Sequence, residues 1–278
     1  MAWSRNMSWT SYYEIPENLC SLYLRRLGTK KKEPTRAYLD ELVYLNQIKI
    51  PFENLDTTLW SEPVSIEPTA LVHKILLENR GGFCFELNGI FSLLLQSLGF
   101  DAHMCPCRQL RHHEPCPVPA THCGILVNLE GQQLFCDVGY GGPVPRGSMV
   151  LKTDVIQSIG KEYFYLKNSA ELEGWLTLYR KSSNPLKADL SLVQIAPISC
   201  YLCDFYGQTM LRSQGPSAYE EMHAAIKMNN GGFANLQNYK LRVKVDDKDT
   251  MRIVSDEEFP LVLQKYFGIM KNKHSERT

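Results

Sequence analysis

The run Arg80-Gly81-Gly82-Phe83-Cys84 constrains this chain most, because it sets a thiol directly after a glycine pair and before an apolar stretch. Residues 84–98 carry Ile, Phe and Leu at helical spacing, and the following Gly99 is typical of a helix end. A thiol in the first turn of a helix feels the positive end of the helix dipole and the unpaired N–H groups there. Both favour the thiolate, the reactive form of cysteine. The sequence therefore predicts that Cys84 is a nucleophile, with two glycines leaving the approach to its sulfur open.

A thiolate catalyst also needs a base and a group that orients the base. Residues 121–139 read as two strands joined by a tight turn at Glu130-Gly131. With a two-residue turn, Gly124 faces Asp137, and the alternation of side chains places His122 and Asp137 on one face. They are then diagonal neighbours, roughly 7–8 Å apart at the backbone and within side-chain reach. A three-residue loop would break this pairing.

Each of these residues also has an ordinary structural interpretation. A cysteine in an apolar run usually acts as a small buried hydrophobe, and an Asp at a strand end is usually a turn former. A lone His in a strand is more often structural than catalytic. The joint pattern of Gly-Gly-x-Cys at a helix start with a His and an Asp on one hairpin face arises much less often by chance, which favours Cys84, His122 and Asp137 as a catalytic set.

Four segments resemble those of the arylamine N-acetyltransferases in wording, order and spacing. They are Ile50-Pro51-Phe52-Glu53-Asn54-Leu55, the block from Arg80 to Asn88, Thr121-His122 and Asp137-Val138-Gly139-Tyr140-Gly141. The resemblance covers most of the chain, and the Arg-Gly-Gly-aromatic-Cys block is its most specific part. The Cys-Phe-Glu-x-Asn wording and the short C-terminus look more like the bacterial members than the vertebrate ones.

The resemblance implies a ping-pong acetyl transfer with acetyl-coenzyme A as co-substrate and without a metal. Cys84 would attack the thioester, His122 would take the thiol proton, and Asp137 would orient His122. The acetyl-cysteine would then pass its acetyl group to an aromatic amine, hydrazine or N-hydroxyarylamine. In the family, the Arg and Glu that correspond to Arg80 and Glu53 form a structural pair, so neither is expected to be catalytic.

The loop after Asp137 is glycine-rich, and such backbone can cradle a pyrophosphate, although a simple turn is the other interpretation. We expect Gly139, Gly141 and Gly142 to contact the coenzyme, and Phe52 and Tyr140 to form aromatic walls against the aryl ring. The stretch Asn229-Asn230-Gly231-Gly232-Phe233 departs from the family's cofactor-contacting wording in the C-terminal third. The contacts there, and the preferred acyl donor, stay open.

Two rival chemistries use the same residues. A structural zinc site could be drawn from clustered Cys and His, although the spacing matches no common zinc finger. A His122 bound to zinc could not serve as a base, so the two hypotheses exclude each other. The order Cys, His, Asp also fits papain-like proteases and transglutaminases, which act on peptides. The residues of the zinc alternative are Cys105, Cys107, His112, His113, Cys116, His122, Cys123, Cys200 and Cys203.

The hydrophobic periodicity predicts an α+β chain, and the resemblance implies that it has a papain-like Cys-His-Asp core. We expect a helical domain over residues 1–100 with Cys84, an antiparallel β-barrel-like domain over 101–210 with His122 and Asp137, and a small α/β lid over 211–278. The expected helices are 18–27, 35–48, 68–79, 84–98, 217–228 and 256–267, and the expected strands are 124–129, 133–138, 162–166, 175–180, 190–195, 239–245 and 250–254.

The charge balance excludes some functions, since 30 Lys and Arg meet 30 Asp and Glu. This gives no electrostatic case for nucleic acid or an anionic membrane as partner. No apolar run approaches the ~20 residues of a membrane span, and residues 1–13 lack the apolar core of a secretory signal. The nine cysteines are then most simply reduced thiols in a cytoplasmic enzyme, whose oligomeric state is open.

Overall fold

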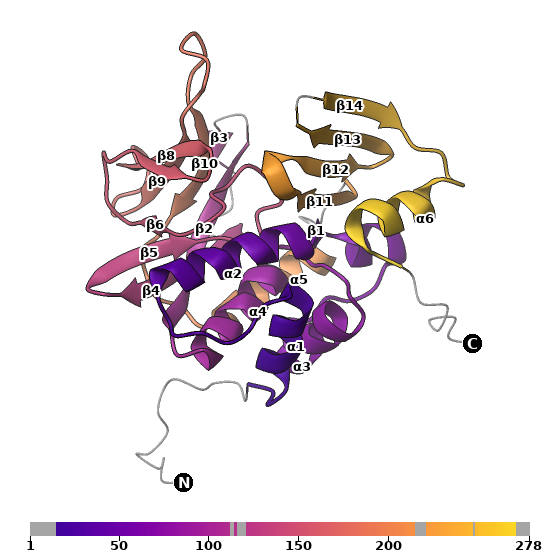
Figure 1. The fold of residues 1–278 in the computed structure, drawn as a ribbon, viewed down its shortest axis with the longest axis horizontal. Helices are drawn as coiled ribbons and strands as arrows, with labels where there is room; N and C mark the ends of the chain where they lie inside the picture. Colours follow the sequence, from indigo (N-terminus) through magenta and orange to yellow (C-terminus); the bar gives the residue numbers. More distant parts are fainter. Residues whose placement is uncertain (1–14, 112–113, 116–120, 215–220, 247, 271–278) are drawn as a thin grey trace.

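The computed structural model of the protein describes residues 15–111, 114–115, 121–214, 221–246 and 248–270. Helices from the first hundred residues form one layer, with a barrel-like sheet and a second, smaller sheet on the other side (Figure 1). The long helix α2 (Arg36–Lys49) runs beneath both sheets in this view. The expected mixture of a helical N-terminal part with antiparallel sheet after it is confirmed.

The N-terminal helices follow the capping signals of the sequence. Helix α1 (Leu19–Leu27) ends at Gly28, which adopts a left-handed φ of 73°. Helix α2 begins after Thr35, whose side-chain oxygen accepts a hydrogen bond from the backbone N–H of Tyr38 at 3.3 Å. Helix α3 (Pro68–Leu71) continues as the π-helical turn η2 (Val72–Leu77), and another π-helical turn, η1, spans Asp56–Trp60.

Helix α4 (Cys84–Ser97) lies in the core and carries Cys84 as its first residue. Its start is fixed by Glu86, whose Oε2 accepts a hydrogen bond from the backbone N–H of Phe83 at 3.0 Å. A Cβ at Gly81 would lie 2.1 Å from the carbonyl oxygen of Pro51. The first glycine is therefore needed for close packing of two backbones, a constraint that differs from the open approach expected from the sequence.

The larger sheet is antiparallel throughout, with the order β6-β5-β4-β2-β10-β9-β8-β7 and the short β3 beside β2. Its interior holds a hydrophobic cluster that includes Phe135, Phe164 and Leu178. The strands are β2 (Asp101–Arg111), β3 (Glu114–Pro115), β4 (His122–Leu129), β5 (Gln132–Cys136), β6 (Met149–Val150), β7 (Gln157–Ile159), β8 (Glu162–Asn168), β9 (Leu176–Arg180) and β10 (Leu190–Ile195).

The smaller sheet joins a short strand from the N-terminal part of the chain to four strands from its C-terminal part. Strand β1 (Phe52–Glu53) pairs with β11 (His223–Lys227), and β12 (Phe233–Gln237), β13 (Lys240–Val245) and β14 (Lys248–Ile253) complete the sheet. Helix α6 (Phe259–Val262) and the π-helical turn η5 (Leu263–Phe267) bury their apolar side chains against it. The N-terminal segment that contains Phe52 is thereby held by C-terminal residues.

One expected element is wrong. Residues 217–228 were predicted as a helix, but 223–227 form strand β11, and 215–220 lie outside the described residues. Pairing with β1 on one side and β12 on the other outweighs the helical preference of Ala224 and Ala225, since intrinsic propensity is weak beside tertiary contacts. The helix of this region is α5 (Tyr206–Gln214), which the sequence analysis missed together with the 11-residue strand β2.

Hydrophobic residues gather in three clusters: one between the N-terminal helices and strands β2, β4 and β5, one inside the barrel-like sheet, and one under the smaller sheet. The first cluster joins parts that the sequence assigns to different domains, so the boundaries at 100 and 210 stay predictions. Among the described helices, none has the length and apolar character needed to cross a membrane.

Beneath the start of α4 lies a buried ionic network of three carboxylates and two cations. Arg80 donates from Nε to Glu53 Oε1 at 3.0 Å and from Nη2 to Asp56 Oδ1 at 2.6 Å. Lys74 Nζ lies 2.6 Å from both Asp56 Oδ2 and Glu86 Oε1. Burial raises the pKa of Glu86 to about 7. The expected pair of Arg80 with Glu53 is confirmed, and the network ties β1, η1 and η2 to the first turn of α4.

We predict that Arg80→Met destabilises the fold by about 3–5 kcal/mol, because it leaves Glu53 buried without its cation and leaves Asp56 with Lys74 alone. Chemical denaturation measures this loss. Arg252→Met is the matched control, since Arg252 pairs with Glu258 on the exposed surface, and it should change the unfolding midpoint little. Equal effects of the two substitutions would contradict a structural role for the network.

Candidate active site

Cys84 occupies the position that the sequence predicts, at the start of α4, but its side chain is only 1% exposed. It lies directly against the loop that follows β5, because a Cβ at Gly139 would come within 2.9 Å of Cys84 Cα. Gly139 thus allows the loop and the helix start to touch. The thiol faces protein groups on nearly all sides, so its neighbours control its ionisation.

The β4–β5 hairpin brings His122 and Asp137 together. The turn is the expected two-residue one, with Leu129 paired to Gln132, and with Glu130 and Gly131 at φ values of 51° and 71°. His122 Nε2 lies 2.6 Å from Asp137 Oδ2, and both side chains are fully buried. The diagonal contact predicted from the side-chain alternation is therefore present.

Asp137 is held by further hydrogen bonds. Its Oδ1 accepts from Asn88 Nδ2 at 3.0 Å and from the backbone N–H of Gly139 at 2.8 Å. Asn88 also donates to the carbonyl of Cys123 and accepts from the backbone N–H of Val138. One amide on α4 thereby holds the ends of both hairpin strands.

Gln47 supports the same loop from helix α2. Its Nε2 donates to the backbone carbonyl of Asp137 at 2.8 Å and to that of Pro145 at 2.9 Å. The sequence analysis missed both Gln47 and Asn88 as site residues. Asn88 had a detectable signal, since it lies four residues after Cys84 and therefore on the same face of α4. Gln47 had none, because its partners are distant in sequence.

The charges of the three predicted catalytic residues depend on one another. Burial disfavours the thiolate of Cys84, but interactions with Cys123 and His122 outweigh it and lower its pKa to about 5. Burial likewise disfavours the imidazolium of His122, but Asp137 and Cys84 raise its pKa to about 10. The pKa of Asp137 is lowered, because His122 and Asn88 outweigh burial. At neutral pH the site therefore holds a thiolate, an imidazolium and a carboxylate.

The imidazole has one nitrogen for each partner. Asp137 occupies Nε2, so Nδ1 is the ring nitrogen left for proton exchange with Cys84. Within the described residues, Nδ1 makes no hydrogen bond of ordinary geometry, although the ring lies close enough to the thiol for each to shift the other's pKa.

Cys123 is a second thiol at the nucleophile that the sequence analysis assigned only to the zinc alternative. Its Sγ lies 3.4 Å from the carbonyl oxygen of Cys84, to which it donates, and it also interacts with the Cys84 thiol. Burial raises the pKa of Cys123 well above its usual value, so it stays a neutral S–H donor. A neutral donor next to a thiolate favours the charged form.

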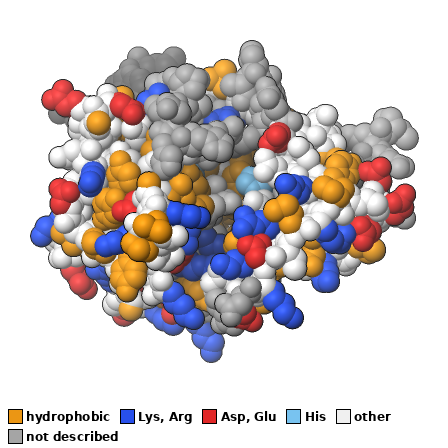
Figure 2. Space-filling model, turned by 90° about the horizontal axis from the view of Figure 1, so that it is seen from above, with side chains coloured by type: hydrophobic (Ala, Val, Ile, Leu, Met, Phe, Trp, Pro, Cys, Tyr) orange, Lys and Arg blue, Asp and Glu red, His pale blue; other side chains and the backbone are white. Residues whose placement is uncertain are grey.

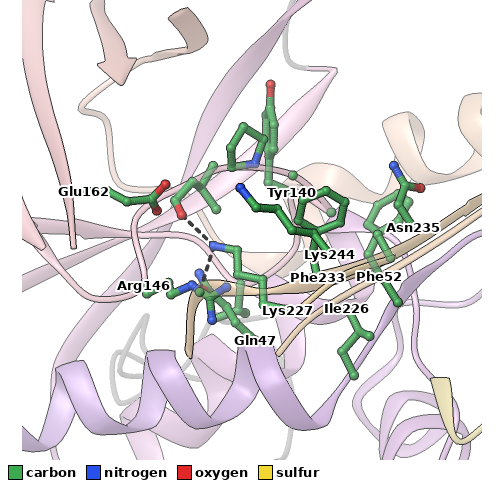
Figure 3. A pocket seen from close by; sticks show the side chains of 18 of the residues that line it. Gln47, Phe52, Tyr140, Arg146, Glu162, Ile226, Lys227, Phe233, Asn235 and Lys244 are labelled. Atoms are coloured by element: carbon green, nitrogen blue, oxygen red, sulfur yellow. Dashed lines mark hydrogen bonds between the residues drawn. The ribbon is translucent and has the colours of Figure 1, made fainter. Parts of the chain in front are cut away.

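The predicted coenzyme and substrate residues surround the same place. The Tyr140 ring meets the His122 ring edge-on, with centroids 5.3 Å apart. A Cβ at Gly141 would lie 2.7 Å from Phe52 Cγ, so the loop packs against that ring. Phe52, Tyr140, Gly141 and Gly142 line a cavity of about 420 Å³ (Figure 3), whereas Gly139 lies against Cys84 instead.

The zinc alternative finds no support among the residues that the structure describes, which contain no group of three or more Cys, His, Asp or Glu placed to hold a metal. His122 bonds to Asp137 through Nε2. Cys105 and Cys107 have their sulfurs 4.0 Å apart inside the barrel-like sheet. His112, His113 and Cys116 lie outside the described residues. The eight described cysteines, Cys200 and Cys203 included, are free thiols.

We predict that iodoacetamide labels Cys84 before the other cysteines at pH 7, because its thiolate is already formed. Partly exposed Cys20, Cys200 and Cys203 should react later, since burial raises the pKa of each. Peptide mass spectrometry after timed quenching gives the order, and the urea-unfolded chain should label evenly. Faster labelling of Cys20 than of Cys84 would contradict a Cys84 thiolate that reagents can reach.

We predict that Asp137→Asn lowers the alkylation rate of Cys84 at pH 7 and destabilises the fold by up to about 3 kcal/mol. The amide of Asn keeps the shape of Asp137 but removes its negative charge, which raises the pKa of His122. A less protonated His122 then stabilises the Cys84 thiolate less. Asp101→Asn is the control, since Asp101 pairs with His103 at an exposed site of the same sheet. An unchanged alkylation rate in Asp137→Asn would refute the coupling.

The sequence and the fold are both similar to those of known N-acetyltransferases. The sequence model of a family described as N-acetyltransferase matches residues 37–275. An arylamine N-acetyltransferase / N-hydroxyarylamine O-acetyltransferase of Salmonella typhimurium is 38% identical over 124 residues, which are 45% of this chain and 44% of the relative. The aligned part thus spans less than half the length of this curated relative.

Solved structures extend the likeness over nearly the whole chain. The arylamine N-acetyltransferase structure from Salmonella typhimurium superposes with a TM-score of 0.84 and 24% identity, covering 94% of both chains, which shows the fold. The Mycobacterium marinum enzyme, solved in complex with CoA, gives a TM-score of 0.81 and 25% identity, covering 90% of this chain and 92% of the other. With a family match over most of its length, this chain belongs to the arylamine N-acetyltransferase family.

Proposed function

We propose that this protein transfers an acetyl group from acetyl-coenzyme A to an aromatic amine, hydrazine or N-hydroxyarylamine, through an acetyl-Cys84 intermediate. The observation that carries the proposal is the Cys84 thiolate at the start of α4, beside an imidazolium that is hydrogen-bonded to Asp137. Family membership supports the arylamine acceptor. The relative from Mycobacterium marinum that was solved with CoA supports the donor.

In the first half-reaction, the Cys84 thiolate attacks the thioester carbonyl, and a carbon–sulfur bond forms as the carbonyl electrons move to oxygen. His122 gives its proton to the departing coenzyme A sulfur as the second carbon–sulfur bond breaks. Exchange of one thioester for another is close to thermoneutral, so the acetyl-Cys84 intermediate is about as stable as acetyl-coenzyme A. Backbone N–H groups at the start of α4 are the candidate donors for the oxyanion.

In the second half-reaction, the amine of the acceptor attacks the acetyl-Cys84 carbonyl. An aromatic amine is weakly basic and neutral at pH 7, so its lone pair is available. His122, now neutral, takes the proton from the amine as the intermediate collapses and the Cys84 thiolate leaves. Asp137 keeps the imidazole oriented and stabilises its charged form in both half-reactions. The cycle ends with the original ion pair, and it is a ping-pong mechanism because coenzyme A leaves before the amine attacks the acetyl-enzyme.

Substrate contacts are proposed around the loop after β5. Gly141 and Gly142 would offer backbone N–H groups to the coenzyme, whereas the N–H of Gly139 is already donated to Asp137. Phe52 and Tyr140 would flank the aryl ring. These positions are supported by the contact of Tyr140 with His122 and by the packing of Phe52 on Gly141. Because Cys84 is 1% exposed, the side chains around it must shift before a donor reaches the sulfur.

A peptide hydrolase or transglutaminase would use the same three residues. Acyl transfer to a small amine is preferred because the chain belongs to a family whose matched relative is named for arylamine acetylation. The proposal includes no metal and no nucleic-acid or membrane partner. A cytoplasmic location stays a prediction from the sequence.

We predict that intact mass spectrometry after mixing with acetyl-coenzyme A shows a gain of one acetyl group, and that an arylamine then removes it. Peptide mapping should place the group on Cys84. Cys84→Ser should show no gain while remaining folded, and Cys136→Ser, at a buried thiol on β5, should still be acetylated. Acetylation of another cysteine, or none with acetyl-coenzyme A, would contradict the proposal.

A further inference from the structure

The cavity beside the catalytic residues has two chemically different sides. It lies between the loop after β5, helix α2 and strands β11–β13 (Figure 3). Phe52, Tyr140 and Phe233 give it aromatic walls. Seen from above, Lys and Arg side chains gather around a hollow near the centre of the molecule (Figure 2). The charged residues that line the cavity are Arg146, Glu162, Arg180, Lys227, Arg242 and Lys244.

The charges of this lining do not balance. The one carboxylate, Glu162, is already paired with Arg180, and Arg242 is paired with Asp249 outside the cavity. Among the described residues, no carboxylate lies within ion-pair distance of Lys227 or Arg146, or of the exposed Lys244. Buried or half-buried charge is costly when unpaired, so this arrangement favours an anion as ligand.

Lys227 is fixed by neutral groups. Its Nζ donates to Gln47 Oε1 at 2.8 Å and to the carbonyl of Val144 at 2.5 Å. An ammonium has three N–H donors, so one remains for a ligand in the cavity. Burial and the charge of Arg146 lower the pKa of Lys227 to about 7. An anion beside it would restore the charged form.

Arg146 stands next to Lys227 and is also held by neutral groups. Its Nη1 donates to the carbonyl of Met228 at 2.7 Å, and its Nη2 donates to that of Gly232 at 2.8 Å. Its pKa is lowered by burial, which the charges of Glu162 and Tyr44 offset only in part, and no ion pair of Arg146 with a carboxylate is found among the described residues. Two neighbouring cations held in place by backbone carbonyls offer a preformed cradle for a carboxylate.

The cavity borders the reacting groups. Val138 and Tyr140 line it, and Gly139 between them lies against Cys84. The Gln47 amide that accepts from Lys227 also donates to the backbone carbonyl of Asp137. An aromatic ring between Phe52 and Tyr140 can therefore point one end toward Cys84 and the other toward Lys227.

We propose that this cavity holds the acyl acceptor, and that Lys227 and Arg146 select aromatic amines that carry a carboxylate over neutral ones. The inference rests on the proposed acetyl transfer and names the acceptor class for it. The aromatic walls hold the ring, the two cations hold the carboxylate, and the amine faces acetyl-Cys84. The size of the cavity, about 420 Å³, suits a single substituted ring.

Steady-state kinetics with 4-aminobenzoate and the neutral, nearly isosteric 4-aminobenzamide test the inference. The natural protein should show the lower KM for 4-aminobenzoate. Lys227→Met should raise that KM about tenfold or more, because a charge-assisted contact is lost, with the KM values for 4-aminobenzamide and acetyl-coenzyme A unchanged. Lys227→Arg should keep part of the preference. Lys248→Met, an exposed lysine on β14 outside the cavity, is the matched control.

Calorimetric binding of the two acceptors to Cys84→Ser separates this inference from the proposed reaction, since binding needs no acetyl transfer. Tighter binding of 4-aminobenzoate, lost in Cys84→Ser with Lys227→Met, supports the acceptor site even if no acetylation is found. Equal binding of the two acceptors would overturn it. An increase in the KM for acetyl-coenzyme A alone in Lys227→Met would also overturn it, because the cations would then serve the donor's phosphates. Circular dichroism confirms that each variant is folded.

Discussion

The structure depends on keeping three charges together in its interior. The Cys84 thiolate and the His122 imidazolium are each costly to bury unless they stay paired, and Asp137 compensates the imidazolium from the other side. This requires the first turn of α4 to meet the open end of the β4–β5 hairpin. Asn88 meets that requirement, because it lies one turn after Cys84 and bonds to Asp137. The geometry of the candidate site and the packing of helix on sheet are therefore one constraint.

A second group of buried charges supports the segment that carries Cys84. The network of Glu53, Asp56, Lys74, Arg80 and Glu86 fixes the segment before Cys84, and Glu86 caps the helix that carries it. Strand β1 extends this support to the C-terminal sheet by pairing with β11. Phe52 of β1 and Lys227 of β11 line the cavity next to the candidate site. Residues from the three regions that the sequence predicts thus lie at the site or line the adjoining cavity.

Local signals in the sequence predicted much of this arrangement. The Gly-Gly-x-Cys run, Thr35 and Gly28 marked helix ends correctly, and the Glu130-Gly131 turn fixed the register that joins His122 to Asp137. Features that depend on distant partners were not predictable in the same way. Strand β11 was taken for a helix because its neighbours β1 and β12 come from elsewhere in the chain. Gln47, Cys123 and Lys227 owe their roles to contacts across many residues, so no spacing rule points to them.

The charge state of Cys84 is the claim on which the whole account depends, and it can be measured without any substrate. Thiolates absorb in the ultraviolet where thiols do not, so a pH titration of the protein minus the same titration of Cys84→Ser isolates this one group. The account predicts a transition centred at about pH 5, set by Cys123 and His122 against the opposing effect of burial. A transition near 9.0, the ordinary cysteine value, would show that the sulfur is neutral at pH 7 and would contradict the account.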